Sequence, residues 1–536
     1  MPDIGYKEQF ERFGPAYRWM LVIAGTSGSV SAMISSTMVN VAIPSITGAF
    51  GVEQGLAQWV ATAFFATMVA SQLLNSWVIA ALGERVAFCS VLIIFSAGAF
   101  IGATSETLET LVAGRIMQGF AAGILAPLVM SAVISVFPDE RRGFAISLFS
   151  VGTIVSPGFG PFIGGLAIDT FSWRHMFLVP LPLVGIALIL GAFLMPHRKF
   201  SLRNLPPFNW TGYILLVIAI ICIMGGIGNG QRWGWTSDRT LLTFLIGIAS
   251  GTAFVISQLH VRNPLLDPTL FLNPQFTSAV ILAFVFGAAT FATNYSVPVF
   301  VQMVQGFTPT KAGMILIPAG IMMMMIIPVA GWISDRVPNH LPIMLGCLMF
   351  TLAMYLVSDA DVNTTFWGIA LLIMLSRSGH GIVKPNMGRA ALASIPTEKI
   401  NQGVGTFNFI RQLGGAFGVN IMVVILEMRT AFHSEALTMT QTAGNPVSRE
   451  FLHKVETILN EAGVAEAVQQ PGALNYLGKV LYAQAMTMGF QDSFMILAVV
   501  FLFVLIPAWI LSRANKHVVA RQLEKKKAKE EKALAA

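Results

Sequence analysis

The chain has 536 residues, of which 55% are hydrophobic and only 11% are charged, against about 25% in soluble domains. This composition excludes a large soluble domain. The net charge of +7 does not indicate nucleic-acid binding, because the basic residues lie mainly in alternate loops, as the positive-inside rule expects of membrane proteins. We expect no nucleic-acid partner.

Long apolar stretches separated by short polar segments run through the whole chain. Most are close to the roughly 20 residues that an α-helix needs to cross a bilayer. Because the hydrocarbon core holds no water, each stretch must satisfy its backbone hydrogen bonds internally, as a helix. We therefore predict an all-α polytopic membrane protein with about fourteen spans. They lie approximately at 18–40, 57–80, 86–105, 112–136, 144–167, 175–195, 210–229, 240–259, 275–304, 310–333, 340–358, 365–387, 404–428 and 488–512.

The N-terminal segment, residues 1–17, precedes an apolar span that is too long for a signal peptide and lacks a clear cleavage site. We expect this first span to stay uncleaved. Basic residues mark the loops expected on the same side as the N-terminus: Arg85, Arg141, Arg142, His197, Arg198, Lys199, Arg203, Arg336, Lys525, Lys526, Lys527 and Lys529. Both termini are therefore predicted to be cytoplasmic, with a charged tail at 514–536.

Residues 430–486 form a polar insertion between the last two spans. Apolar residues recur at helical spacing around Phe451 to Leu459 and again around Leu474 to Leu481, after Pro471. This pattern predicts two amphipathic helices on the outer side. Two interpretations stay open: a loop lying on the membrane surface, and a docking surface for a periplasmic partner.

A weak internal repeat divides the chain. Ser76–Ala80 follows the second span and Gly331–Asp335 follows the tenth, each at the inner end of the second helix of a six-helix half. The predicted division is an N-terminus at 1–17, a first half at 18–200, an extra helix pair at 201–262, a second half at 263–513 and a tail at 514–536.

Several motifs, in order, resemble the major facilitator superfamily, and within it the fourteen-helix drug:proton antiporters of the EmrB/QacA type. The segments that carry the resemblance are Thr37–Pro44, Arg115–Gly119, Pro138–Gly143, Gly152–Gly165, Trp173–Phe177 and Arg411–Gly415. The resemblance implies a major facilitator fold of two six-helix halves with two extra central helices, set in the inner (plasma) membrane. It also implies drug export driven by a proton gradient.

Two sets of residues follow from these motifs. A pivot motif consists of Gly152, Pro157, Gly160, Pro161, Gly164 and Gly165, in which glycines allow close backbone approach and prolines bend the helix. A plain packing seam of small residues would contain the same glycines. A cytoplasmic gate consists of Glu140, Arg141, Asp335 and Arg336, for which an ordinary solvated loop is the alternative.

The chain departs from the family at two acidic positions. Ser35 stands where the family usually carries an aspartate in helix 1, and Ala80 stands where it carries one after helix 2. Proton coupling therefore lacks its usual acid.

Cations, in contrast, occur within the spans, and no carboxylate lies convincingly at mid-span. A charge at bilayer depth is costly and marks a functional site by default. The residues predicted to line the substrate and proton pathway are Ser35, Asn40, Arg115, Gln118, Arg377, His380, Lys384, Arg411 and Gln412. For Arg115 and Arg411, bonding to backbone carbonyls is the structural alternative.

Arg377, His380 and Lys384 share one helix face over about 10 Å. A cavity lined by this basic stripe would favour anionic substrates such as carboxylate metabolites or fatty acids. The alternative is that the Lys384 side chain extends to the inner membrane interface and only Arg377 lies deep in the span. The methionine run at 322–325 offers a soft pocket wall or ordinary core packing.

The prediction is thus a secondary active exporter of amphipathic or anionic compounds. The alternatives are a dedicated exporter of one anionic metabolite, such as a carboxylate siderophore, and a non-transporting receptor or scaffold. No phosphate-binding loop and no catalytic group of residues is recognisable, so we expect no enzyme activity and no cofactor. The three cysteines fall in different spans, so we expect no metal site. The family resemblance adds a periplasmic adaptor and an outer-membrane channel as partners.

Overall fold

The computed structural model describes residues 4–137, 142–196, 207–261, 264–334, 336–396 and 399–511. These residues form helices and no strands, which confirms the all-α prediction. In chain order the elements are α1 (Ile4–Phe13), α2 (Ala16–Phe50), α3 (Gln54–Ala57), α4 (Trp59–Gln72), α5 (Asn75–Leu82), α6 (Glu84–Ala103), α7 (Leu108–Val136), α8 (Arg142–Thr170), η2 (His175–Phe177), α9 (Leu181–Leu194), α10 (Trp210–Trp233), α11 (Asp238–His260), η4 (Pro268–Leu272), α12 (Pro274–Met303), α13 (Pro309–Met314), α14 (Leu316–Ser334), α15 (His340–Val357), α16 (Phe366–Ala393), α17 (Ile400–Met439), α18 (Pro446–Glu461) and α19 (Glu466–Phe503).

Among the described residues, twelve helices are long and apolar enough to cross a membrane, and thirteen if the bent pair formed by Gln54–Gln72 (α3 and α4) and α5 is one span. The 60° bend of that pair replaces the straight span expected at 57–80. The α8 helix, which occupies the expected span 144–167, is not among the thirteen. The number fourteen therefore stays a prediction, while the polytopic helical architecture is confirmed.

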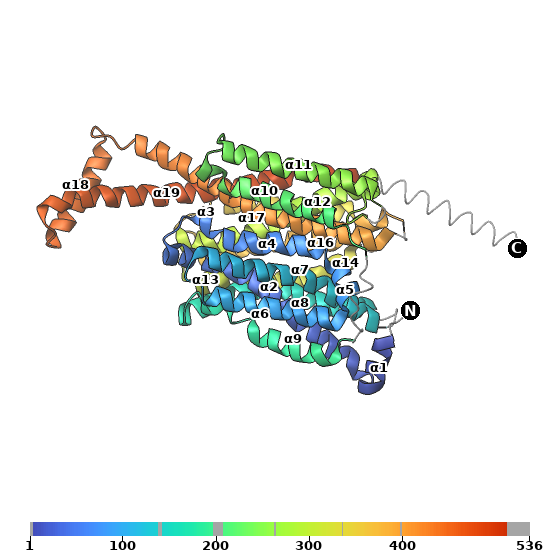
Figure 1. Ribbon diagram of the computed structural model, residues 1–536. Helices are drawn as coiled ribbons and strands as arrows, with labels where there is room; N and C mark the ends of the chain where they lie inside the picture. The colour runs from blue at the N-terminus through green and yellow to red at the C-terminus, as the bar shows by residue number, and fades with distance from the viewer. Residues whose placement is uncertain are drawn as a thin grey trace.

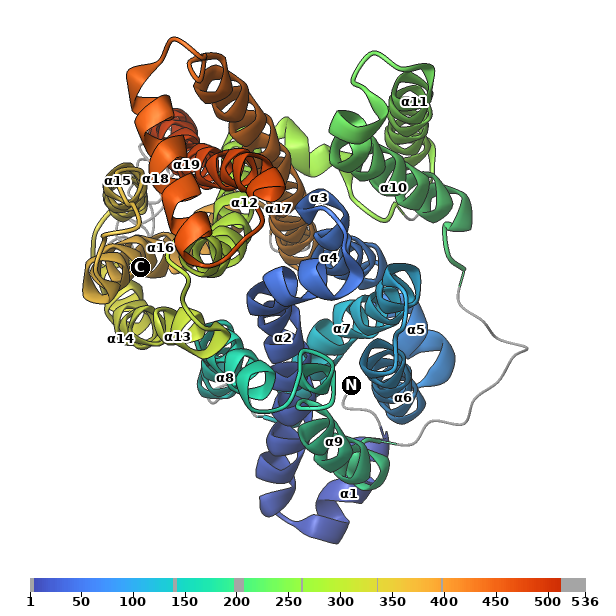
Figure 2. The ribbon, with the colours of Figure 1, turned by 90° about the vertical axis from the view of Figure 1, so that its left-hand side faces the viewer.

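The helices run roughly side by side in one bundle (Figure 1). Seen from the end in Figure 2, α2 and α4 to α9 gather on one side, and α12 to α17 with α19 gather on the other. The helix pairs that join the two groups include α2 with α12, α4 with α17, and α8 with α13 and with α14. The α10–α11 hairpin lies outside both groups, and α10 packs against α4 and α17 at their seam.

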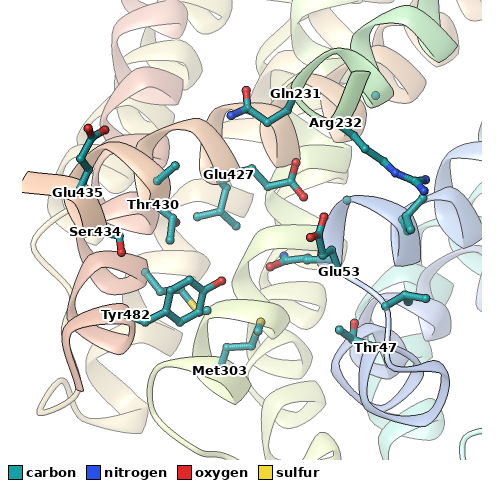
Figure 3. Close-up of a pocket in the computed structure, with 18 of the residues that line it drawn as sticks. Thr47, Glu53, Gln231, Arg232, Met303, Glu427, Thr430, Ser434, Glu435 and Tyr482 are labelled. Atoms are coloured by element: carbon teal, nitrogen blue, oxygen red, sulfur yellow. The ribbon is translucent and has the colours of Figure 1, made fainter. Parts of the chain in front are cut away.

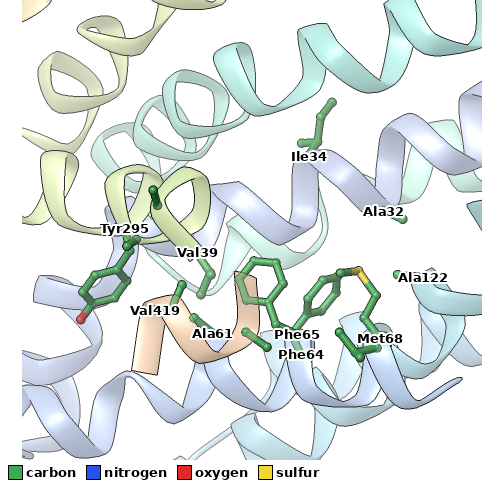
Figure 4. Close-up of a cluster of buried hydrophobic side chains, with 14 of the residues drawn as sticks. Ala32, Ile34, Val39, Ala61, Phe64, Phe65, Met68, Ala122, Tyr295 and Val419 are labelled. Atoms are coloured by element: carbon green, nitrogen blue, oxygen red, sulfur yellow. The ribbon is translucent and has the colours of Figure 1, made fainter. Parts of the chain in front are cut away.

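Apolar side chains from both groups meet at this seam (Figure 4). Val39 of α2 and Tyr295 of α12 are fully buried there. Phe65 of α4 packs edge to face on Phe291 of α12, with ring centroids 4.6 Å apart. Such aromatic pairs stabilise packing beyond their buried area. The two groups are thus held together by a shared hydrophobic core.

Two helices are far longer than a membrane needs. The 40 residues of α17 and the 38 residues of α19 correspond to nearly 60 Å each, about twice the thickness of a hydrocarbon core. Their excess lengths, together with α18, form an arm that projects from one end of the bundle (Figure 1). Phe451 of α18 stacks on Tyr476 of α19 at 6.0 Å between ring centroids, which joins the parts of the arm.

The arm corrects the expected layout of residues 430–486. Two amphipathic helices were predicted there, and α18 is the first of them. The second is not a separate helix: Leu474 to Leu481 belong to α19, which runs unbroken from Glu466 into the last span despite Pro471. The arm also extends along the bundle axis (Figure 1) and does not fold back over the bundle, as a loop on the membrane surface would.

Candidate functional site

Arg115 is fully buried in α7 and is surrounded by neutral acceptors. Its Nε donates to the carbonyl oxygen of Val60 at 2.9 Å, and its Nη1 donates to Oε1 of Gln118 at 2.9 Å. Its guanidinium also lies 4.2 Å from the ring centroid of Phe64. None of the ion pairs among the described residues includes Arg115. Its charge is therefore stabilised by dipoles and one aromatic face.

Ser35 is one of these neutral partners. Nη1 of Arg115 lies 3.3 Å from the carbonyl oxygen of Ser35 and 3.2 Å from its hydroxyl oxygen. A carboxylate at this position would reach the same guanidinium. Ser35 gives Arg115 neutral hydrogen bonds and no charge partner. The sequence analysis listed Ser35, Arg115 and Gln118 among the predicted pathway residues, and in the structure their side chains lie in one cluster.

Arg377 lies in α16 and is 94% buried. Its Nη2 donates a hydrogen bond to Oδ1 of Asn294, from α12. Nδ2 of Asn40, from α2, donates to the backbone carbonyl oxygen of the same Asn294 at 3.1 Å. Asn294 therefore connects two predicted pathway residues that lie in different halves of the bundle.

Asn294 was missed by the sequence analysis. The signal that could have found it is an N-x-x-x-P pattern that occurs in the first helix of each half, as Asn40 with Pro44 and as Asn294 with Pro298. A single asparagine in an apolar span attracts no attention without that comparison.

His380 is fully buried one turn further along α16. The ring centroids of Phe286 and Phe350 lie 4.8 and 4.7 Å from its own, and its Nε2 is 3.3 Å from Oγ1 of Thr290. It is packed among aromatic rings and has no exposed surface in this conformation. Lys384, a further turn along, is partly exposed, so the predicted stripe passes from a buried to a more accessible environment.

Two further predicted residues lie on α17, and both are partly exposed. Nε2 of Gln412 donates to Oε1 of Gln72 at the end of α4, at 3.0 Å. This bond again crosses between the halves. Arg411 contributes its backbone carbonyl to a close contact with Gly287 of α12, where an added Cβ would collide with it.

The glycines of the predicted pivot motif point to two different neighbours. A Cβ added at Gly152 would lie 2.8 Å from Thr26, and one at Gly164 would lie 3.0 Å from Cβ of Met38, both on α2 of the same half. A Cβ at Gly165 would lie 2.6 Å from the backbone nitrogen of Thr310, in the other half. Gly160 also faces α2, and Pro157 and Pro161 lie within the same helix.

Gly158, inside the same motif, makes another close contact between the halves. A Cβ added there would lie 2.9 Å from Cα of Gly320 in α14. The α8 helix thus presents one row of small residues to α2 and another to α13 and α14. A close backbone approach on both faces is the geometry that a pivot requires, and it is also the geometry of a packing seam.

Most of the predicted cytoplasmic gate, Glu140, Arg141 and Asp335, lies outside the described residues. Arg336 is described and exposed, and its guanidinium lies 3.8 Å from the ring centroid of Trp332. This stacking is a cation–π contact, and it does not test the predicted cytoplasmic gate.

A cavity of about 1070 Å³ opens at the end of the bundle from which the arm projects (Figure 3). Glu53, just before α3, lines it from the first half, and Glu427 and Tyr482 line it from the second half. Arg232, at the end of α10, adds a positive charge. The sequence analysis missed this acidic cavity, because Glu53 lies in a short loop and Glu427 lies at the very end of a predicted span.

The described residues contain no group of three or more His, Cys, Asp and Glu side chains placed to hold a metal ion. The cysteines Cys89, Cys222 and Cys347 are free thiols on α6, α10 and α15. The described residues therefore provide buried positive charge, from Arg115 and Arg377, inside the bundle and carboxylates, from Glu53 and Glu427, in the cavity at one end of it.

The sequence profile of the Major Facilitator Superfamily matches residues 26–419, which is well over half of the chain. The chain belongs to the major facilitator superfamily. Members of this superfamily are multi-pass membrane transporters, so the predicted transporter class is confirmed at this level.

Curated relatives share about a quarter of the sequence. "Multidrug export protein EmrB" of Haemophilus influenzae is 25% identical over 492 residues, which is 91% of this chain and 95% of the relative. "Probable multidrug resistance protein EmrY" of Escherichia coli is 26% identical, over 92% and 94%. "Uncharacterized MFS-type transporter YhcA" of Bacillus subtilis is 26% identical over 89% of both chains. The resemblance to EmrB-type transporters holds along most of the chain.

Solved structures support the fold alone, because their sequence identities are low. A POT family transporter in complex with 5-aminolevulinic acid has a TM-score of 0.64 at 14% identity, covering 94% of this chain and 97% of its own. An inward-facing, unoccupied bacterial homologue of the human lysosomal transporter Spinster has a TM-score of 0.60 at 16% identity, covering 93% and 98%.

Proposed function

We propose that this member of the superfamily is a secondary active efflux permease that exports amphipathic or anionic small molecules by alternating access, driven by a proton gradient. The observation that carries the proposal is the pair of buried guanidinium groups, Arg115 and Arg377, whose described partners are all neutral. A buried cation held only by dipoles is ready to pair with an anion, because charge-assisted bonds are about twice as strong as neutral ones.

The direction and breadth of transport are inferred from the relatives, two of which are named as multidrug export or resistance proteins. A dedicated exporter of one anionic metabolite, such as a carboxylate siderophore or a fatty acid, is the second candidate. Arg377 favours it, since its guanidinium is nine-tenths buried and held by a single described acceptor. A site of that kind discriminates by charge more than a soft apolar pocket does.

For proton coupling we propose His380. It is the side chain on the basic stripe whose charge ordinarily changes near neutral pH. In the present conformation it is sealed among Phe286, Phe350 and Phe501, so proton exchange belongs to another state of the cycle. Glu53 and Glu427 would be the first acceptors that protons from the outer side meet, because both line the outer cavity.

We also propose an inner-membrane location with both termini in the cytoplasm. The cavity and the arm then face the periplasm. The arm is the proposed docking element for a periplasmic adaptor and, through it, an outer-membrane channel. Its length favours this role, because α17 and α19 each exceed a membrane span by about 30 Å.

The proposal is tested with purified protein in proteoliposomes under an imposed pH gradient. Two matched fluorescent probes are compared: anilinonaphthalenesulfonate, an anion, and N-phenylnaphthylamine, its neutral counterpart without the sulfonate. We expect gradient-dependent flux of the anion that ends when a protonophore collapses the gradient. Flux of neither probe would contradict a transporter of amphipathic anions, and protein-free liposomes provide the background.

A further inference from the structure

The first helix of each half contains a proline four residues after an asparagine: Asn40 and Pro44 in α2, and Asn294 and Pro298 in α12. In an α-helix the carbonyl of residue i accepts from the N–H of residue i+4. Proline has no N–H, so the backbone carbonyls of Asn40 and Asn294 lose their helical donors. A buried carbonyl without a donor is costly and takes another partner where one is in reach.

The carbonyl of Asn294 takes its partner from the other half of the protein. Nδ2 of Asn40 donates to it at 3.1 Å, and both asparagines are more than nine-tenths buried. The side-chain oxygen of Asn294 is at the same time the acceptor for Nη2 of Arg377. One residue thus ties the first half, through Asn40, to the guanidinium proposed to bind substrate.

This tie lies between the outer cavity and the centre of the bundle. The cavity is lined by Thr47 of α2 and Met303 of α12. These residues lie seven and nine positions beyond Asn40 and Asn294, which is about 10 to 14 Å along the helices. A second bond between the halves lies next to the tie, from Nε2 of Gln54 to the hydroxyl of Tyr295 at 3.3 Å. The outer side is therefore closed at this level.

We propose that Asn40, Asn294 and Arg377 form an outer latch, and that an anion bound to Arg377 releases it. A carboxylate or sulfonate forms two charge-assisted bonds with a guanidinium, whereas Asn294 offers one neutral oxygen. The anion therefore displaces the side chain of Asn294 from Arg377, and Asn294 loses the contact that holds it where its carbonyl accepts from Asn40 of α2. The bond between the halves is weakened as a result. The outer side then opens and export follows. This inference rests on the proposed function, because it takes an anion as the substrate.

The two prolines allow a matched test of the latch itself. Pro298→Ala restores an N–H that competes with Asn40 for the carbonyl of Asn294. Pro44→Ala is the control, since it removes a proline of the same kind from α2 and changes neither atom of the Asn40–Asn294 bond. Asn40→Asp keeps the shape of the side chain but removes its N–H donor, and so tests the same bond from the other side.

Opening is measured by the distance between two spin labels in lipid nanodiscs. The labels are carried by Glu106→Cys and Val362→Cys, with the three native cysteines replaced. Both positions are exposed. Glu106 lies at the outer end of the bundle, because the neighbouring Ser105 accepts a hydrogen bond from Arg174, and Trp173 packs on Phe50 at the outer end of α2. Val362 lies at the same end, because the neighbouring Asp361 accepts a hydrogen bond from Gln305, just after the outer end of α12.

Pro298→Ala and Asn40→Asp are expected to raise the open-to-closed ratio roughly fivefold without any substrate, as the loss of one neutral hydrogen bond allows. Pro44→Ala is expected to leave it unchanged. Anilinonaphthalenesulfonate is expected to open the wild-type protein more than N-phenylnaphthylamine does, because only the anion competes with Asn294 for Arg377. Asn294→Asp places a carboxylate against Arg377, and this carboxylate competes with the added anion. The variant protein is therefore expected to stay closed when the anion is added.

Three results overturn the inference. If Pro298→Ala and Asn40→Asp leave the distance unchanged, no latch exists at this point, whatever the substrate is. If Pro298→Ala and Pro44→Ala open the protein equally, the effect belongs to helix bending and not to the tie. If the latch variants open but the anion does not open the wild type, release through Arg377 is wrong, and flux of the anion in proteoliposomes then decides separately whether the proposed substrate class stands.

Discussion

Buried positive charge without a carboxylate partner is the main feature of this protein at the scale of single residues. Arg115 uses the fork of its guanidinium to reach Val60, Ser35 and Gln118 at once, which lysine cannot do. The planar group also lies on Phe64. The sequence predicted Ser35, Arg115 and Gln118 because family motifs and an unusual charge in an apolar span both point to them.

Arg115→Lys is therefore expected to destabilise the protein by about 1.5–3 kcal/mol, the range for losing a hydrogen bond to a charged group. Thermal unfolding in detergent, followed by intrinsic fluorescence, measures the change. Arg449→Lys, on the exposed surface of α18, is the control and is expected to have no effect beyond about 0.5 kcal/mol. Equal stability of the two variants would mean that the contacts of Arg115 contribute nothing.

Asn294 was not predictable in the same way. It is uncharged and stands beside other uncharged polar residues, Thr293 and Ser296, so neither charge nor periodicity distinguishes it in the sequence. Its role depends on Asn40 and Arg377, which are 254 and 83 positions away along the chain. Contacts of this kind are a product of helix packing, and a single sequence carries no record of them.

At the scale of secondary-structure elements, α8 combines two packing faces. Gly164 faces α2 of its own half, whereas Gly158 and Gly165 face α13 and α14 of the other half. The sequence predicted the small residues of this helix but not which neighbour each one meets. The assignment to faces needed the positions of the surrounding helices.

Gly158→Ala is expected to push α8 and α14 apart, because the new Cβ would lie 2.9 Å from Cα of Gly320 and backbone atoms cannot turn aside. We expect a loss of most transport in the proteoliposome assay together with a lower melting temperature. The matched control is Gly331→Ala, a helical glycine with no atom within 4 Å of an added Cβ. If both variants transport like the wild type, the close approach at Gly158 is not required.

The linker from α11 to α12 is held by Asp267, whose side chain is 10% exposed. Burial raises the pKa of Asp267, but hydrogen bonds from Lys399 and Thr269 outweigh it and hold the pKa below its usual value. A carboxyl whose pKa is depressed by folding stabilises the fold above its unfolded pKa. That contribution is lost as the pH falls through the folded pKa.

Asp267→Asn is accordingly expected to lower stability by up to about 1 kcal/mol at neutral pH, because it removes the ion pair with the partly exposed Lys399 but leaves a side chain that caps a helix equally well. The difference from the wild type should shrink below about pH 4. Melting temperatures across this range give the result, with Glu461→Gln on the exposed end of α18 as a reference. A difference that does not change with pH would show that the charge of Asp267 is not what stabilises the linker.

At the scale of the whole molecule, the sequence predicted the helical bundle well, because span length and hydropathy are set directly by the bilayer. It predicted the arm less well, because Pro471 and Gly472 resemble a helix break. In the structure Gly472 packs against Leu459 of α18, and tertiary contact outweighs the local signal. The seam where α10 meets α4 and α17 was beyond prediction, since an extra hairpin has several places to lie against two six-helix groups.

The central claim is that Arg377 recognises the negative charge of the exported compound. The most direct test compares wild type with Arg377→Gln in proteoliposomes under a pH gradient, using anilinonaphthalenesulfonate and N-phenylnaphthylamine in parallel. We predict that the substitution lowers flux of the anion by about tenfold or more, because a charge-assisted pair is lost. Flux of the neutral probe should remain within about twofold, since the substitution changes no contact specific to it. An equal loss of both fluxes would contradict the account and assign Arg377 a structural role.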